Sequence, residues 1–332
     1  MLLDYVSLAG GLVALIIAGD LLVRGSVSIA KRLGIPNLVI GLTIVAFGTS
    51  APELVISLGA ALENAGGIAV GNVVGSNIAN VLAVLGLPAL IAATPCGEDG
   101  ATRNAVFMVA VTVIFIALAS TGTLGLLSGL VLLGLLALFL LDSARATRRH
   151  RKDLKDGAAA SCCDGASSVD DIEDVEGVPE NTLLAIAYIL IGLVGLPLAA
   201  QFTIDGATGI AQAWGVSDAV IALTVIALGT SLPELATTVM AAIRQHGAVA
   251  IGNVIGSNVF NLLAIMGITS AIVPIEVPAE ILNFDVWVML GCAVLLLALA
   301  KWRVCLGKVT GLLLCAAYAG YIFAVYAMGL SS

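Results

Sequence analysis

The sequence predicts an all-α polytopic membrane protein with ten transmembrane helices, arranged as two inverted-topology repeats of five helices each. Three observations predict this class. The 332 residues are 60% apolar and 11% charged, whereas a soluble domain has about 25% charged residues. Ten apolar stretches are long enough to cross a bilayer, which takes about 20 residues. The two halves of the chain also share long, closely similar stretches.

One polar segment separates five of these stretches from the other five. Residues 143–180 are rich in Asp, Ser, Gly and Ala without apolar periodicity, so we expect a flexible, acidic, cytoplasmic linker there. Residues 1–142 then form the first five-helix half, and residues 181–332 form the second. The expected spans are 5–30, 38–62, 68–93, 104–120, 123–142, 181–212, 217–243, 248–273, 284–300 and 306–329.

The positive charges predict how the chain is oriented. Every Lys and Arg except Arg24 lies in or beside the connections after the first, third, fifth, seventh and ninth spans. The positive-inside rule places both termini outside and the linker in the cytoplasm, in a protein of the plasma (inner) membrane. No basic region precedes the first apolar run, so we expect a membrane helix there and not a signal peptide. Arg24 follows Asp20 by four residues, which predicts an ion pair within one helix; a gating role is the alternative.

Composition also excludes several partners. The net charge of −8 and the lack of a basic domain argue against nucleic acid, and nothing in the sequence indicates an obligate protein partner or a cofactor. The acidic run of the linker lacks EF-hand spacing, so we expect it to be solvated, with Cys162 and Cys163 as an incidental pair. An intramembrane protease would use paired aspartates in other motifs, so we do not expect an enzyme.

Two motifs occur once in each half at a constant offset of 181 residues. GLTIVAFGTSAPEL from Gly41 returns as ALTVIALGTSLPEL from Ala222, and GNVVGSNIANVLAVLG from Gly71 returns as GNVIGSNVFNLLAIMG from Gly252. The repeats therefore cover about 38–93 and 217–273. An odd number of spans separates them, so they have opposite orientations. Such repeats usually form a substrate site near the midplane, where they meet.

The first motif predicts a cation site. Pro52 and Pro233 stand within apolar stretches, where a proline removes one backbone donor and frees carbonyl groups one turn earlier. Glu53 and Glu234 follow them, and a carboxylate at membrane depth costs at least a few kcal/mol. No Lys or Arg stands at mid-membrane to pair with them. Two carboxylates with hydroxyl and carbonyl oxygens suit Na⁺ or Ca²⁺.

The second motif supplies neutral oxygens. Ser76 and Asn80 are four residues apart and share one helix face, as do Ser257 and Asn261, and we expect both faces to look toward the glutamates. We expect the third and eighth helices to be broken, like the second and seventh. The other asparagines of the motif either bind the ion or satisfy broken backbone: Asn72, Asn77, Asn253 and Asn258.

At these residues the chain resembles the calcium/cation antiporter superfamily, and within it the sodium/calcium exchanger branch. The family carries G-T-S-x-P-E and G-N-x-x-G-S-N-x-x-[ND] twice. The resemblance implies two inverted five-helix units, alternating access and exchange of Na⁺ for Ca²⁺. It also implies that the first and sixth helices, with Asp20 and Asp205, form a mobile pair. The implied ion ligands are the carbonyl groups of Ala46 and Ala227 and the side chains of Thr49, Ser50, Glu53, Ser76, Asn80, Thr230, Ser231, Glu234, Ser257 and Asn261.

Two properties of the exchange follow from this resemblance. Some relatives, including potassium-dependent exchangers, have Asp where this chain has Asn261, so we expect potassium independence. Exchange of more than two Na⁺ for one Ca²⁺ would move net charge and make transport sensitive to voltage. Ca²⁺/H⁺ antiport at the same glutamates is the alternative, because burial favours the neutral form of a carboxyl group. A channel is a further class, which a requirement for a counter-ion would exclude.

Overall fold

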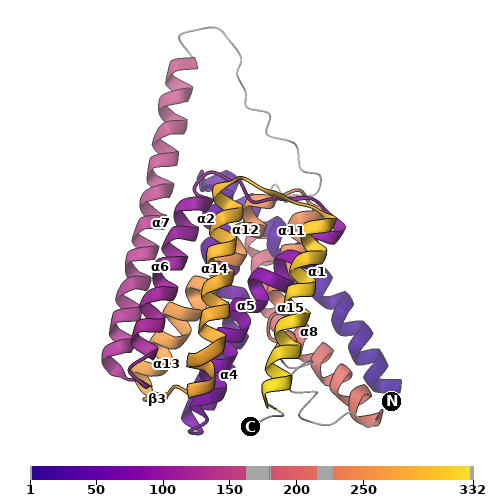
Figure 1. Cartoon of the computed structure of the whole chain (residues 1–332). Coiled ribbons are helices and arrows are strands. Elements are labelled where there is room, and N and C mark those ends of the chain that lie inside the picture. The colour runs from indigo at the N-terminus through magenta and orange to yellow at the C-terminus, as the bar shows by residue number, and fades with distance from the viewer. Residues whose placement is uncertain (1, 162–178, 180, 215–226, 330–332) are drawn as a thin grey trace.

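The computed structural model describes residues 2–161, 179, 181–214 and 227–329, and nearly all of these residues are helical (Figure 1). Eight helices are apolar and long enough to cross a membrane, and a bent helix pair supplies a ninth span. The remaining expected span, the seventh (217–243), is described only from residue 227 onward. The chain is therefore a multi-pass membrane protein, as the sequence predicts.

The unbroken spans surround the two repeat motifs and lie close to the expected ranges. They are α1 (Leu2–Leu33), α5 (Gly66–Ile91), α6 (Ala101–Ala119), α7 (Leu126–Ser161), α8 (Thr182–Ala213), α12 (Gly247–Phe260) continued by α13 (Met266–Ile272), α14 (Val286–Lys301) and α15 (Lys308–Gly329). A π-helical turn, Asn261–Ile265, joins α12 to α13, and another, Ile281–Asp285, precedes α14.

The second span is broken at the first motif, as predicted. It consists of α2 (Asn37–Ile40), a π-helical turn (Gly41–Val45), α3 (Ala46–Thr49) and α4 (Ala51–Leu62), and the chain bends by 45° between α3 and α4. The seventh span repeats the break between α10 (Ala227–Gly229) and α11 (Leu232–Ile243). Ser50 and Ser231 have nearly equal backbone angles at the two breaks, φ −83°, ψ 7° and φ −87°, ψ 5°.

The predicted breaks in the third and eighth spans are wrong. α5 runs without interruption through the Gly71–Asn80 motif, and α12 continues into α13 through one π-helical turn. The physical reason is that neither copy of this motif contains proline. Glycine and asparagine keep their backbone N–H groups, so every helical hydrogen bond can still form.

The first part of the expected linker is also helical and not flexible. α7 continues to Ser161, well past the predicted end of the span at residue 142. Residues 144–155 contain mainly Ala, Arg, Lys and Leu, which are strong helix formers. The acidic run with Cys162 and Cys163 lies outside the described residues.

Two short antiparallel strand pairs join the halves of the protein. β1 (Thr94–Pro95) pairs with β4 (Cys305–Leu306), and β2 (Thr123–Leu124) pairs with β3 (Ile275–Glu276). Each pair takes one strand from each half of the chain. Strands of two residues leave no recognisable pattern in a sequence, so the sequence did not predict them.

The helices form two groups (Figure 1). The long helices α1 and α8 lie against one another, and their glycines allow close packing, because a Cβ atom on Gly11 would lie 3.0 Å from the Ala199 carbonyl oxygen. The other helices surround α5 and α12, which are deeply buried. The N-terminal end of α1 and the C-terminal end of α15 lie at one face, the terminus face. α7 ends at the opposite face, the linker face.

Candidate functional site

Glu53 and Glu234 occupy equivalent places directly after the two helix breaks. Each lies in the first turn of its helix, α4 or α11, and each side chain is fully buried. The Ser50 hydroxyl donates to Glu234 Oε1 at 3.0 Å, so the breaks of the two repeats face one another. The structure therefore brings together the two glutamates that the sequence singled out.

Several buried side-chain oxygen atoms of the two motifs, including three of the four glutamate carboxyl oxygens, have no hydrogen-bond partner. Carboxylate and amide oxygens are acceptors only, so they cannot satisfy one another. Leaving such acceptors buried and unpaired costs about 1–3 kcal/mol each, and a bound cation would remove that cost. Among the described residues of the two motifs, the unpaired atoms are Glu53 Oε1 and Oε2, Glu234 Oε2, Asn80 Oδ1, Asn261 Oδ1 and the hydroxyl oxygens Ser231 Oγ and Ser257 Oγ.

Asn72 and Asn253 support the broken backbone. Asn253 Nδ2 donates to the Glu234 carbonyl at 3.3 Å and to the Thr237 and Thr238 hydroxyls at 2.9 and 3.0 Å. Asn72 Nδ2 makes the equivalent contacts in the first repeat, with the Glu53 carbonyl at 3.3 Å and the Ser57 hydroxyl at 2.9 Å. Of the two roles left open by the sequence, these contacts assign the structural one.

Asn77 and Asn258 orient the two predicted amide ligands. Asn80 Nδ2 donates to Asn258 Oδ1 at 3.2 Å, and Asn261 Nδ2 donates to Asn77 Oδ1 at 3.1 Å. Each NH₂ group is thus bound to the opposite repeat. The carbonyl oxygen of the same amide is left unpaired, as a cation ligand requires.

The remaining predicted ligands also lie at or near the breaks. The Ala46 carbonyl already has hydrogen-bond partners, because it accepts from the Ser50 backbone N–H at 3.1 Å and from Thr49 Oγ1 at 3.2 Å. Pro52 does not free this carbonyl group, because Ala46 lies more than one helical turn before the proline. Thr49 Oγ1 also donates to Asn253 Oδ1 at 3.3 Å. Three further predicted residues are placed here: Ser76 and Thr230 are buried, and the backbone of Ala227 opens α10.

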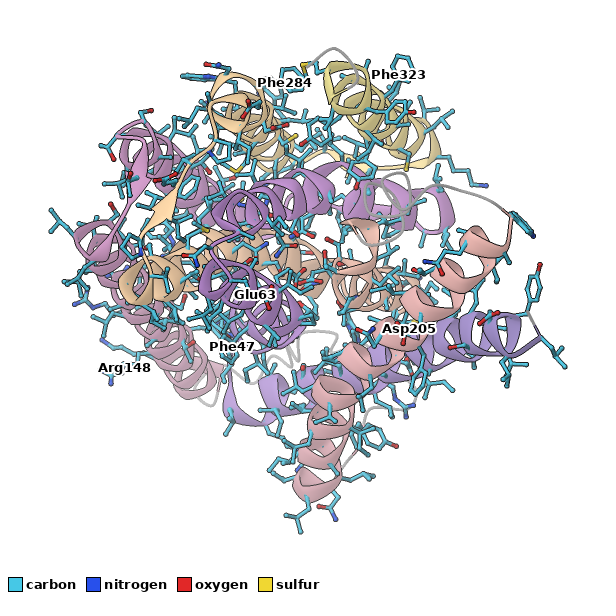
Figure 2. The ribbon with its side chains drawn as sticks, turned by 90° about the horizontal axis from the view of Figure 1, so that it is seen from below. Phe47, Glu63, Arg148, Asp205, Phe284 and Phe323 are labelled. Atoms are coloured by element: carbon cyan, nitrogen blue, oxygen red, sulfur yellow. The ribbon has the colours of Figure 1, made fainter. Side chains whose placement is uncertain are left out.

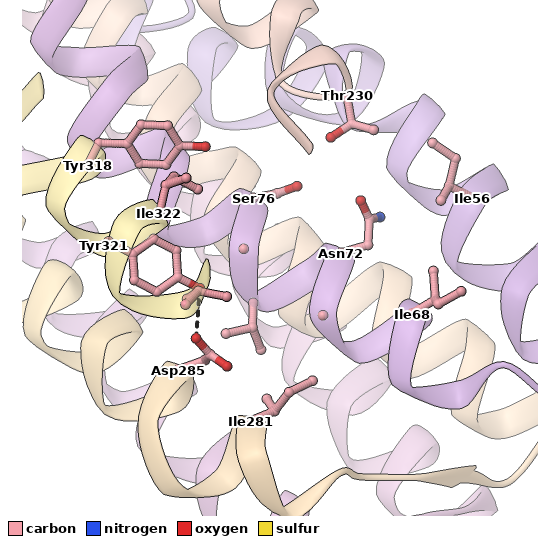
Figure 3. Close-up of a pocket in the computed structure, with 14 residues that line it drawn as sticks. Ile56, Ile68, Asn72, Ser76, Thr230, Ile281, Asp285, Tyr318, Tyr321 and Ile322 are labelled. Carbon is pink, nitrogen blue, oxygen red and sulfur yellow. Dashed lines mark hydrogen bonds between the residues drawn. The ribbon is translucent and has the colours of Figure 1, made fainter. Parts of the chain in front are cut away.

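A cavity of about 530 Å³ borders the site and contains a carboxyl group that the sequence did not single out. Ser76, Thr230 and Asn72 line one side, and Asp285 and Tyr321 line the other (Figure 3). The Tyr321 hydroxyl donates to Asp285 Oδ1 at 2.8 Å. Asp285 is the one charged residue in the expected span 284–300, and that isolation is the signal that could have identified it.

The electrostatics of the site favour hard cations. The recorded ion pairs of the described residues involve the carboxylates of Asp20, Asp99 and Asp142 and leave Glu53 and Glu234 without a basic partner. No group of three or more His, Cys, Asp or Glu side chains suited to a metal occurs in that same part of the protein. Two carboxylates with neutral oxygens suit Na⁺ or Ca²⁺ better than a transition metal.

Comparison with known proteins identifies a consistent set of relatives. The family model for sodium/calcium exchanger protein matches residues 3–143 and 184–327. The chain is 33% identical to the putative antiporter CaxA of Alkalimonas amylolytica, covering 98% of this chain and 99% of that protein. It is also 33% identical to the sodium/calcium exchanger MaX1 of Methanosarcina acetivorans, covering 89% of this chain and 90% of that one.

A solved structure shares the fold. The sodium-calcium exchanger NCX_Mj, soaked with 2.5 mM Na⁺ and 0.1 mM Ca²⁺, superimposes with a TM-score of 0.78 at 29% identity, covering 97% of this chain and 98% of the other. The match extends over both halves, which confirms the predicted fold of two inverted five-helix repeats.

Proposed function

Because the chain belongs to the sodium/calcium exchanger protein family, we propose that it exchanges Na⁺ for Ca²⁺ by alternating access, with both ions competing for the oxygen cluster around Glu53 and Glu234. The observation that carries this proposal is the set of buried, unpaired acceptor oxygens contributed by both repeats. The two carboxylates together offer a charge of −2, which balances one Ca²⁺. Na⁺ ions would use the same carboxylates with the neutral oxygens.

The finer properties of this exchange depend on the neutral ligands. Asn80 and Asn261 are both amides, so only two carboxylates face the cluster, and we propose that K⁺ is not required. Exchange of three or more Na⁺ for one Ca²⁺ would be electrogenic. An inside-negative potential would then favour Ca²⁺ export, by about 2.3 kcal/mol per charge and 100 mV. The basic connections on the linker face support a cytoplasmic location of that face.

The proposal is tested by ⁴⁵Ca²⁺ uptake into proteoliposomes loaded with Na⁺, with K⁺ or with choline, and separately under a pH gradient alone. We expect uptake only with internal Na⁺, and we expect Glu53→Gln and Glu234→Gln to abolish it. Glu276→Gln is the matched control, because Glu276 is an exposed carboxylate away from the cluster and its replacement should leave uptake intact.

Each alternative predicts a different outcome. Uptake driven by the pH gradient and indifferent to Na⁺ would contradict sodium coupling and identify a Ca²⁺/H⁺ antiporter at the same site. Uptake without any counter-ion would indicate a channel. Full activity in both glutamine variants would contradict the assignment of the site itself.

A further inference from the structure

The two faces of the protein differ, although the repeats are related by sequence. The offset of 181 residues makes Ala236 in α11 equivalent to Val55 in α4. Ala236 is 8% exposed, whereas Val55 is 72% exposed. α1 covers Ala236, because a Cβ atom on Gly19 would lie 3.1 Å from the Ala236 carbonyl oxygen. α11 approaches the linker face and α4 the terminus face (Figure 1), so the helix pair α1–α8 closes the linker face and leaves α4 uncovered.

An ion pair lies where α1 meets the end of α11. Arg244, the residue directly after α11, donates through Nε to Asp20 Oδ1 of α1. Asp20 also accepts from Arg24 Nη1 within α1, at 3.4 Å. The side chains of Asp20 and Arg244 are only 17% and 25% exposed, so water screens their attraction incompletely. The Asp20–Arg244 pair is thus a charged link between the mobile helices and the rest of the protein.

The equivalent positions at the terminus face carry no such pair. The offset relates Asp20 to Gln201, Arg24 to Asp205 and Arg244 to Glu63. Gln201 Nε2 donates to Asp205 Oδ1 at 2.7 Å. Seen from the terminus face, Glu63 and Asp205 lie apart on different helices (Figure 2). Closing this face would bring Gln201 and its neighbour Asp205 toward Glu63. The carboxylates of Asp205 and Glu63 would then approach one another, so this closure gains no ion pair.

We propose that Asp20 and Arg244 are positioning residues that hold the linker-side access path closed and make the state open to the terminus face the favoured one at rest. This inference rests on the proposed function, because it assigns the resting state of alternating access. A charge-assisted hydrogen bond between partly buried groups is strong enough to shift such an equilibrium by about tenfold. The corresponding contact of the opposite state lacks a positive partner.

The test measures access and needs no ion cargo. Single cysteines replace Val55 or Ala236 in a background without the six native cysteines, and a membrane-impermeant maleimide is added at either face. We expect Arg244→Gln to change the ratio of the two labelling rates by about tenfold. Most of this change should appear as faster labelling of A236C from the linker face, with a smaller slowing of V55C from the terminus face, because the favoured state loses only part of its population. The swap Asp20→Arg with Arg244→Asp should restore the original rates.

Two further variants make the test specific. Arg303→Gln removes the exposed ion pair with Asp99, which lies outside α1 and α11, so it should leave both rates unchanged. Gln201→Asp with Glu63→Arg installs the missing pair at the terminus face and should shift the rates in the same direction as Arg244→Gln. If Arg244→Gln does not fold, the double variant Gln201→Asp with Glu63→Arg tests the proposal by itself.

Unchanged rates in folded Arg244→Gln, or an equal shift in Arg303→Gln, would overturn the proposal. Failure of the proposed function is distinguishable, because it appears as loss of Na⁺-dependent Ca²⁺ uptake in the unmodified protein, whatever the labelling rates.

Discussion

Replacing Asn253 with alanine tests whether this residue holds the helix break or binds the ion. Its side chain is 1% exposed, and its two amide hydrogens serve the Glu234 carbonyl, Thr237 and Thr238. Its oxygen accepts from Thr49. Because two amide hydrogens share the three donated contacts, we count two donated hydrogen bonds and one accepted hydrogen bond. At about 1 kcal/mol each, these three bonds give a loss of about 3 kcal/mol on Asn253→Ala. The partly buried Asn72 donates to two groups, so Asn72→Ala should cost about 1–2 kcal/mol.

Thermal unfolding in detergent, with and without Ca²⁺, separates the two roles. A structural Asn253 lowers the unfolding temperature of the ion-free protein by several degrees, while added Ca²⁺ still stabilises the variant. An ion-binding Asn253 gives the reverse pattern, with an unchanged ion-free protein and no stabilisation by Ca²⁺. The reverse pattern, or a larger loss for Asn72→Ala than for Asn253→Ala, would refute the reasoning.

Three further predictions follow from the described contacts. Glu53→Gln and Glu234→Gln should each remove Ca²⁺-dependent stabilisation while the protein still folds, because each deletes one of two balancing charges; thermal unfolding against Ca²⁺ concentration measures this. Asn261→Asp should make the flux respond to K⁺, because it adds a third carboxylate to the cluster, and an unchanged cation dependence of the flux would contradict the argument from neutral ligands. Burial and Asp99 raise the pKa of Glu98 above 4.5, although Arg303 lowers it. The folded protein therefore keeps this proton to higher pH than the unfolded chain, so stability falls as pH rises from about 4.5 through the raised pKa; Glu98→Gln should reduce that fall in unfolding temperatures measured from pH 4 to 8.

Most of the candidate site could be predicted from the sequence, because the repeat marks it twice. Pro52 and Pro233 stand at the start of α4 and α11, directly after the breaks at Ser50 and Ser231. Pro88 and Pro197 lie inside the continuous helices α5 and α8, so the whole Gly-Thr-Ser-x-Pro-Glu motif, and not proline alone, marks the break. The same reasoning failed where no proline is present. The third and eighth spans remain continuous because glycine and asparagine keep the donors of the helix.

Other features could not be predicted, because they depend on partners distant in the sequence. The roles of Asn72 and Asn253 depend on which carbonyl and hydroxyl groups the folded chain presents to them. Asp285 borders the site only because α14 and α15 pack against α5. The strand pairs join residues about 150 to 210 positions apart. Each strand has only two residues, which is too short to show the alternation of apolar and polar residues that predicts a strand.

The sequence by itself therefore determined the class of protein, the inverted repeats and the two glutamates, because apolar length, charge position and proline act locally. Only the tertiary structure decided which oxygen atoms remain unpaired and which face is covered. Equivalent residues such as Val55 and Ala236 have the same place in their repeats but different surroundings. In this structure the helix pair α1–α8 packs against α11 and not against α4, and that asymmetry is a property of the whole assembly of helices.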